Sequence, residues 1–144
     1  MIQPHSLNYV AILVSAVILW VLGAIWYSPA LFAKPWMEIL GIKKGESKRS
    51  GLMLGMVASF IGDLVLSSIL ATIIFWANAF GFAPSAFGFG NGCVLGVLMW
   101  FGFIAAPNLP QGLYEGRPFK LFAINSGYWL LGLFIVGGLL GAWR

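Results

Sequence analysis

Residues 51–77 read GLMLGMVASFIGDLVLSSILATIIFWA, an apolar run whose single ionisable side chain is Asp63. A helix rises about 1.5 Å per residue, so about 20 residues cross the hydrocarbon core of a bilayer, which is about 30 Å thick. The run exceeds this length. It therefore predicts a transmembrane helix and makes lipid the solvent of the fold.

Three further apolar runs occur at 9–27, 88–106 and 119–143. Over the whole chain 60% of the residues are hydrophobic and 8% are charged, which excludes the water-soluble globular class. We expect a single all-α transmembrane domain over 1–144, an integral membrane four-helix bundle that has the lipid bilayer as its main partner.

The basic residues are unevenly distributed among the connectors. The connector 28–50 contains five of the eight, the connector 78–87 contains none, and two lie around 107–118; they are Lys34, Lys43, Lys44, Lys48, Arg49, Arg117 and Lys120. The positive-inside rule then predicts that connectors 28–50 and 107–118 are cytoplasmic and that both termini lie outside. Because the positive charge reads as a topology signal, no nucleic-acid partner is expected.

The two charged connectors differ in their expected structure. In the first, Phe32, Trp36, Ile39 and Leu40 follow helical spacing, which predicts a short helix lying on the membrane surface; an irregular loop is the alternative. The third connector, 107–118, holds prolines at its start, middle and end, so we expect it not to be a continuous helix.

Two separated sequence signatures carry a resemblance to a known family. The first is Trp26-Tyr27-Ser28-Pro29, continued by Leu31, Phe32, Lys34, Trp36 and Met37; the second is Tyr114-Glu115-Gly116-Arg117-Pro118, followed by Leu121-Phe122 and Ile124-Asn125-Ser126-Gly127-Tyr128. The chain resembles a family of bacterial membrane proteins catalogued as domain of unknown function number seventeen sixty-one. The resemblance implies four helices and a bacterial cytoplasmic (inner) membrane, and it implies no activity or site residues.

Asp63 lies near the middle of its run, where an isolated charge costs about 2.5 to 3.5 kcal/mol on insertion scales. Small and polar residues recur on its side of the helix at Gly55, Ser59, Asp63 and Ser67, so we expect this side to face other helices. Equal depths in the other helices predict an intramembrane polar site, whose members are Asp63, Asn125, Tyr128 and Ser15.

Desolvation disfavours the carboxylate, so we expect Asp63 to be neutral much of the time. A neutral carboxylic acid can donate a hydrogen bond to Asn125 or Ser15. Two interpretations of this residue stay open. Asp63 is either a proton or cation site in a transport path, or a hydrogen-bonded residue that holds helices together.

Glycines spaced four residues apart predict close helix packing. They are Gly88, Gly92 and Gly96 in the third run, Gly51 and Gly55 in the second, and Gly137 and Gly141 in the fourth. The sequence does not distinguish packing within one bundle from packing between subunits, and a homo-oligomer is a plausible assembly.

Three classes of function remain, in decreasing order of expectation. The first is an accessory or packing protein of a larger membrane complex, and the second is a small oligomeric transporter or channel that uses Asp63. An enzyme is the weakest, because one His, one Cys and four acidic residues provide no nucleophile–base pair and no metal cluster. We therefore expect no catalytic residues, no metal and no cofactor.

Overall fold

A computed structural model describes residues 7–43, 45, 49–81 and 87–143, with the side chains of residues 49 and 50 excepted. Within these ranges the chain is all-α. The elements are α1 (Tyr9–Trp26), α2 (Ala33–Leu40), α3 (Arg49–Ala79), α4 (Phe89–Trp100), the π-helical turn η1 (Phe101–Ala105), α5 (Ala106–Tyr114) and α6 (Phe119–Ala142). Lys44 and Lys48 of the first connector, and 82–86 of the second, lie outside the described residues.

The prediction of four membrane-spanning helices is confirmed. The spans are Tyr9–Trp26, Gly51–Ala79, Phe89–Tyr114 and Phe119–Ala142, each long and apolar enough to cross a bilayer. Their boundaries differ from the predicted ones by a few residues, except in the third, which continues well beyond 106. The protein is a multi-pass membrane protein.

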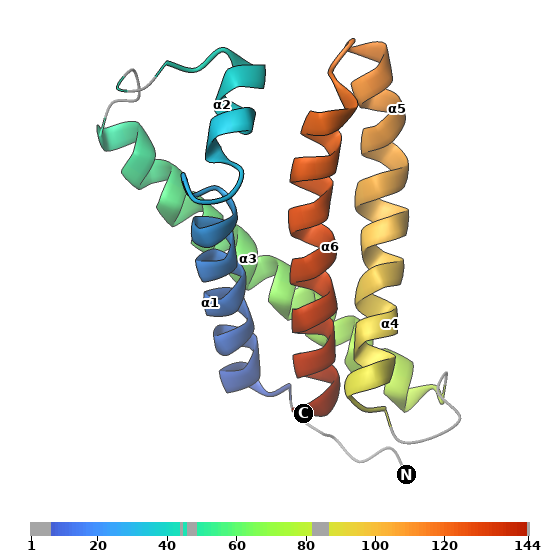
Figure 1. Cartoon of the computed structure of the whole chain (residues 1–144). Helices are drawn as coiled ribbons and strands as arrows, with labels where there is room; N and C mark the ends of the chain where they lie inside the picture. The colour runs from blue at the N-terminus through green and yellow to red at the C-terminus, as the bar shows by residue number, and fades with distance from the viewer. Residues whose placement is uncertain (1–6, 44, 46–48, 82–86, 144) are drawn as a thin grey trace.

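Helix α6 is the centre of the arrangement, because α1 and α4 pack on it and α3 crosses behind it (Figure 1). Helix α3 runs obliquely to the others. It contains 31 residues and is therefore about 46 Å long, more than the hydrocarbon core of about 30 Å. Tilting is the ordinary way in which a long helix fits a thinner bilayer.

Figure 1 also shows how the ends of the chain are arranged. The start of α1 and the end of α6 lie at one end of the bundle, whereas α2 and the turn between α5 and α6 lie at the other. The two basic connectors therefore share one side, as the positive-inside argument requires, although the side of the membrane they occupy stays a prediction.

The first connector forms the short helix α2 (Ala33–Leu40), which Gly41 caps at its C-terminal end. Gly41 adopts the left-handed conformation with φ of 67°, and the next amide, of Ile42, donates to the Met37 carbonyl at 3.0 Å. This is the Schellman arrangement, which favours glycine because it has no Cβ. Helix α2 contacts α6 and rises beside its upper end (Figure 1).

The expectation that 107–118 is not a continuous helix holds only for the last residues of that connector, because 107–114 are helical. The helix continues from α4 through η1 and α5 to Tyr114, with Pro107 in the first turn of α5 and Pro110 inside it. The π-helical turn η1 directly precedes α5, and a turn of this kind already departs from the regular hydrogen-bond pattern that a proline interrupts. Helix α5 ends at Tyr114, and Gly116, two residues later, has φ of 65°.

Helices α4 and α6 approach each other through glycines. A Cβ atom added to Gly92 would overlap the Gly137 carbonyl, and one added to Gly96 would overlap the Leu133 carbonyl. One added to Gly141 would lie 2.6 Å from the Gly88 carbonyl oxygen. The backbones are thus in direct contact, a geometry that only small residues allow in membrane helices.

Tryptophan and tyrosine side chains supply the hydrogen bonds that join the helices. Four of them donate to backbone carbonyls: Trp20 to Met56 at 3.1 Å, Trp26 to Ile124 at 3.0 Å, Trp100 to Ser126 at 2.9 Å and Tyr128 to Leu19 at 3.1 Å. Each bond links two different helices. Large apolar rings with one polar atom thus hold the bundle together, since each ring packs on apolar neighbours and satisfies its own donor.

Candidate functional site

Three buried polar side chains gather where α1 and α3 meet beside α6. Asp63 of α3 is 3% exposed, and Ser67 of α3 and Ser15 of α1 are both 0% exposed. Asp63 and Ser67 are one helical turn apart on the same face of α3. We call Asp63, Ser67 and Ser15, together with Tyr128, the Asp63 cluster.

The register of the two helices places Ser15 beside this face. Trp20 of α1 packs edge-on against Phe60 of α3, with ring centroids 6.3 Å apart, and the two helices run in opposite directions. Moving from this contact to Ser15 takes about 7.5 Å along α1, at about 1.5 Å per residue. The same distance along α3 ends between Asp63 and Ser67, so the three side chains share one level of the bundle.

Tyr128 adds α6 to the cluster. Its hydroxyl group donates to the carbonyl of Leu19, one turn from Ser15, and its phenol lies close enough to Asp63 for a direct electrostatic interaction. Its ring also packs against Tyr27, at a centroid distance of 5.8 Å. Three helices therefore contribute side chains to the Asp63 cluster.

The hydrogen bonds expected of Asp63 are not formed. Within the described residues its carboxyl group has no hydrogen bond to Asn125 or Ser15, and the hydroxyl groups of Ser15 and Ser67 have no partner at all. A serine in a helix commonly donates to the carbonyl four residues earlier, as Ser59 and Ser68 do here. The two buried serines of the cluster do not, so their oxygen atoms stay available.

Asn125 does not belong to the cluster. Its Oδ1 atom accepts a hydrogen bond of 3.0 Å from the hydroxyl group of Tyr27, which lies at the end of α1. Asn125 and Tyr128 are three residues apart on α6, and the sequence could not show that Tyr27 would engage one of them. Asn125 was predicted to share the polar site, but its described partner is Tyr27. Tyr27 in turn packs against Tyr128 of the Asp63 cluster.

Ser67 was missing from the predicted polar site, although its spacing from Asp63 was visible in the sequence. Ser59, which shares that spacing, is exposed and bonds the Gly55 carbonyl of its own helix. The difference follows from the oblique path of α3. Residues 51–59 of α3 are exposed, although Met56 and Phe60 contact Trp20 of α1, and burial begins at Asp63. The polar spacing is therefore buried at Ser67 and open at Ser59.

The predicted packing glycines fall into two groups. Gly92, Gly96, Gly137 and Gly141 lie in the contact between α4 and α6, where the carbonyl of Gly88 also takes part. Gly51 and Gly55 face open space, with no atom within 4 Å of an added Cβ. These two glycines of α3 do not pack within the single chain, because this half of α3 diverges from the bundle.

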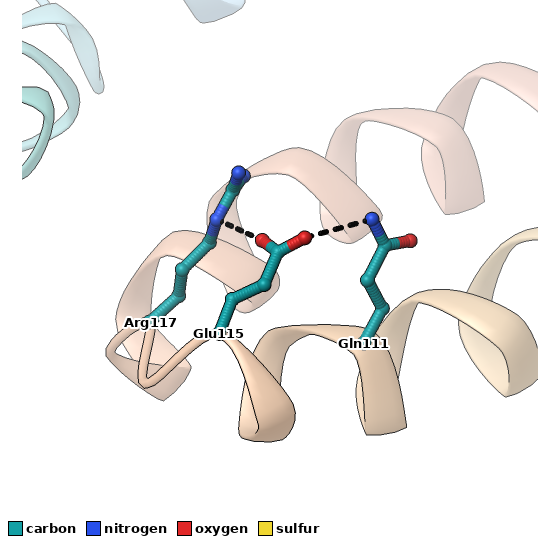
Figure 2. Close-up of polar contacts among 3 residues, drawn as sticks. All are labelled: Gln111, Glu115 and Arg117. Carbon is teal, nitrogen blue, oxygen red and sulfur yellow. Dashed lines mark hydrogen bonds and ion pairs between the residues drawn. The ribbon is translucent and has the colours of Figure 1, made fainter.

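A cavity of about 560 Å³ lies between α5 and α6 and beside α2, at the end of the bundle where the two basic connectors lie. Its wall includes Tyr27, Trp36 and Asn125, and Arg117 and Glu115 lie at its edge. Figure 2 shows the polar contacts there: the Arg117 Nε atom pairs with one carboxylate oxygen of Glu115, and the Gln111 amide donates to the other at 3.0 Å.

Comparison with known proteins gives a family and no activity. No curated protein and no solved structure matches the chain. The profile of a family described as "Protein of unknown function (DUF1761)" matches residues 10–141, which include both sequence signatures and all four spans except the terminal residues Tyr9 and Ala142. The chain therefore belongs to the DUF1761 family, as its two signatures suggested.

Proposed function

We propose that this protein is a small oligomeric membrane transporter or channel in which the Asp63 cluster binds a proton or a monovalent cation. One observation carries the proposal: the buried residue Asp63 shares one level of the bundle with two fully buried serine hydroxyl groups, which have no hydrogen-bond partner within the described residues. Unpaired buried polar groups are costly, and in native proteins they call for a specific explanation.

The alternative role for Asp63, a hydrogen-bonded link between helices, requires hydrogen bonds that this carboxyl group does not make. The links between helices are made instead by Trp20, Trp26, Trp100 and Tyr128. An intramembrane acid is costly to keep for packing alone. A binding role gives the carboxyl group and both hydroxyl groups a partner.

Charge balance supports a monovalent ligand. No Lys or Arg occurs in 50–116, and Lys120 lies at the start of α6, two turns away from Tyr128. A proton or a monovalent cation neutralises the single carboxylate, whereas a divalent cation would leave a net charge of one in the bundle. Burying an unpaired charge in a medium of low dielectric constant is strongly unfavourable.

A single chain of four spans offers little room for a continuous path, which supports an oligomer. The residues of α3 from Gly51 to Ser59 are exposed, although the Met56 carbonyl accepts a hydrogen bond from Trp20 of α1. A second copy of the chain could cover them and help to enclose a path beside Asp63. The role is one of binding and transport, and we propose no enzymatic activity.

Flux in proteoliposomes tests the proposal. Vesicles that hold the wild-type protein should dissipate an imposed proton, sodium or potassium gradient, read with an ion-sensitive dye inside the vesicle. Asp63→Asn should abolish the flux and Asp63→Glu should keep part of it. Ser59→Ala is the matched control, because Ser59 lies on the same helix but is exposed. Flux equal in wild type and Asp63→Asn, or no flux above empty vesicles, would refute the proposal.

A second candidate is an accessory or packing protein of a larger membrane complex, favoured by the uncovered Gly51 and Gly55 of α3. Close helix contacts use such glycines, and here they have no partner in the chain. Purification in mild detergent should then recover the same larger complex repeatedly, and Gly55→Leu should release it. Recovery of a homo-oligomer alone would count against this role and agree with the first.

The proposed location is the bacterial inner membrane, with connectors 28–50 and 107–118 in the cytoplasm and both termini outside. Reporter enzymes fused in the turn between α5 and α6 and at the C-terminus test the orientation. A periplasm-dependent reporter should be active at the C-terminus and inactive in the turn. The opposite pattern would invert the topology.

A further inference from the structure

The cavity between α5 and α6 has an apolar body and a polar edge. Its wall includes the apolar side chains Trp36, Ile104, Leu113, Phe119, Phe122 and Trp129. Its volume of about 560 Å³ lies within the range of small-molecule sites, which is about 300–1,000 Å³. The fourth span begins at Phe119, so this cavity lies where a bilayer passes from hydrocarbon to headgroups.

The charged groups at the edge leave hydrogen-bond donors unused. Both carboxylate oxygens of Glu115 are engaged, one by Arg117 and the other by Gln111 (Figure 2). Arg117 uses its Nε atom for this ion pair, and its two terminal nitrogens have no partner within the described residues. These two nitrogens form a planar fork that suits a phosphate or carboxylate group.

Asn125 provides a further donor on the cavity wall. Its Oδ1 atom is occupied by the hydroxyl group of Tyr27, which fixes the amide and leaves the Nδ2 group without a described partner. Helix α6 begins beside the cavity at Phe119 without a side-chain cap, and the positive end of its dipole favours an anion there. The amide oxygens of Asn108 and Gln111 are the free acceptors, and they suit the hydroxyl or ammonium groups of a headgroup.

We propose that this cavity binds an anionic membrane phospholipid, with Arg117 on the phosphate group and the start of an acyl chain against Trp36, Phe122 and Trp129. The combination of an oxyanion site with an apolar wall at the end of a span matches this ligand class and not a freely soluble anion. The site is separate from the Asp63 cluster and does not depend on the function proposed for it.

Native mass spectrometry of the full-length protein in detergent tests this proposal. The probes are phosphatidylglycerol, phosphatidylcholine with the same chains, and inorganic phosphate as competitor. We expect the protein to retain phosphatidylglycerol more strongly than phosphatidylcholine. Arg117→Gln should weaken phosphatidylglycerol binding by about tenfold, because a charge-assisted hydrogen bond is lost. Arg117→Lys should recover part of it, since the charge stays while the fork is lost.

Lys120→Gln is the matched control, because it removes one positive charge from an exposed residue that does not line the cavity. It should change binding by less than about twofold. Equal losses in Arg117→Gln and Lys120→Gln would overturn the site, since they would show attraction by net charge alone. Displacement of the lipid by an equal concentration of inorganic phosphate would overturn the lipid assignment in favour of a soluble phosphate. Gel filtration of each variant verifies that it is folded.

Discussion

The hydroxyl group of Tyr128 donates a buried hydrogen bond of 3.1 Å to the backbone carbonyl of Leu19, and so joins the last helix of the chain to the first. The same side chain lies within electrostatic range of Asp63 of α3. One residue thus joins α6 to α1 within the Asp63 cluster, which makes its loss measurable in both stability and binding.

Tyr128→Phe removes this hydrogen bond and keeps the ring. The free energy of unfolding should fall by about 0.6 to 1.5 kcal/mol, the range measured for hydrogen bonds between membrane helices and for hydrogen bonds in general. Tyr114→Phe is the control, because Tyr114 is 92% exposed and should leave the stability unchanged. Denaturation in mixed micelles measures both. Equal effects in the two variants would contradict the structural role of Tyr128.

Gly96→Ala should destabilise the contact between α4 and α6. Its Cβ would overlap the Leu133 carbonyl, and overpacking of this kind costs about 1 to 3 kcal/mol. Gly55→Ala should raise the stability of α3 slightly, because the added Cβ would meet no neighbour within 4 Å and alanine is a better helix former than glycine. Thermal unfolding in detergent compares them. A destabilised Gly55→Ala protein whose oligomer dissociates would instead place Gly55 in a subunit interface.

Trp100→Phe should weaken the link between the third span and α6. The indole nitrogen donates to the carbonyl of Ser126 at 2.9 Å and lies 3.1 Å from its hydroxyl oxygen. We expect the free energy of unfolding to fall by about 1 to 2 kcal/mol, because the ring becomes smaller and the Ser126 carbonyl loses its partner. Trp143→Phe, at an exposed site at the end of α6, should have little effect in the same unfolding assay.

Ser67→Ala should separate stability from function. The variant removes a fully buried hydroxyl group without a partner, so the free energy of unfolding should rise by about 1 kcal/mol. If the hydroxyl group binds the transported cation, flux through proteoliposomes should fall in the same variant. Ser68→Ala is the control, since its hydroxyl group already bonds the Leu64 carbonyl. A stable Ser67→Ala protein with unchanged flux would remove Ser67 from the ion site.

The sequence could not predict the course of the third span. Pro107 and Pro110 indicated a break, because proline lacks an amide donor and crowds the preceding turn. The π-helical turn 101–105 changes the hydrogen-bond pattern of the helix before these prolines, and no local sequence pattern predicts such a turn. The helix therefore reaches Tyr114, which brings Arg117 and Glu115 to the edge of the cavity.

The partners of the polar residues were also beyond sequence reasoning. Equal depth in the bilayer placed Ser15, Tyr128 and Asn125 beside Asp63, but depth does not fix the direction in which a side chain points. The rotation of each helix about its axis decides that direction. In this bundle the side chain of Asn125 points toward Tyr27 and accepts its hydrogen bond. Ser67 belongs to the cluster because the second half of α3 is the more deeply buried half.

The sequence by itself determined four spans, the helical class and the gathering of basic connectors at one end. These are properties of local composition, because a bilayer requires each apolar segment to satisfy its own backbone hydrogen bonds. Only the tertiary structure decided the oblique path of α3, which glycines touch and which polar groups are left without partners. Lipid is as apolar as the helices it surrounds, so hydrophobicity cannot choose between packing arrangements, and the choice falls to the fit of particular side chains.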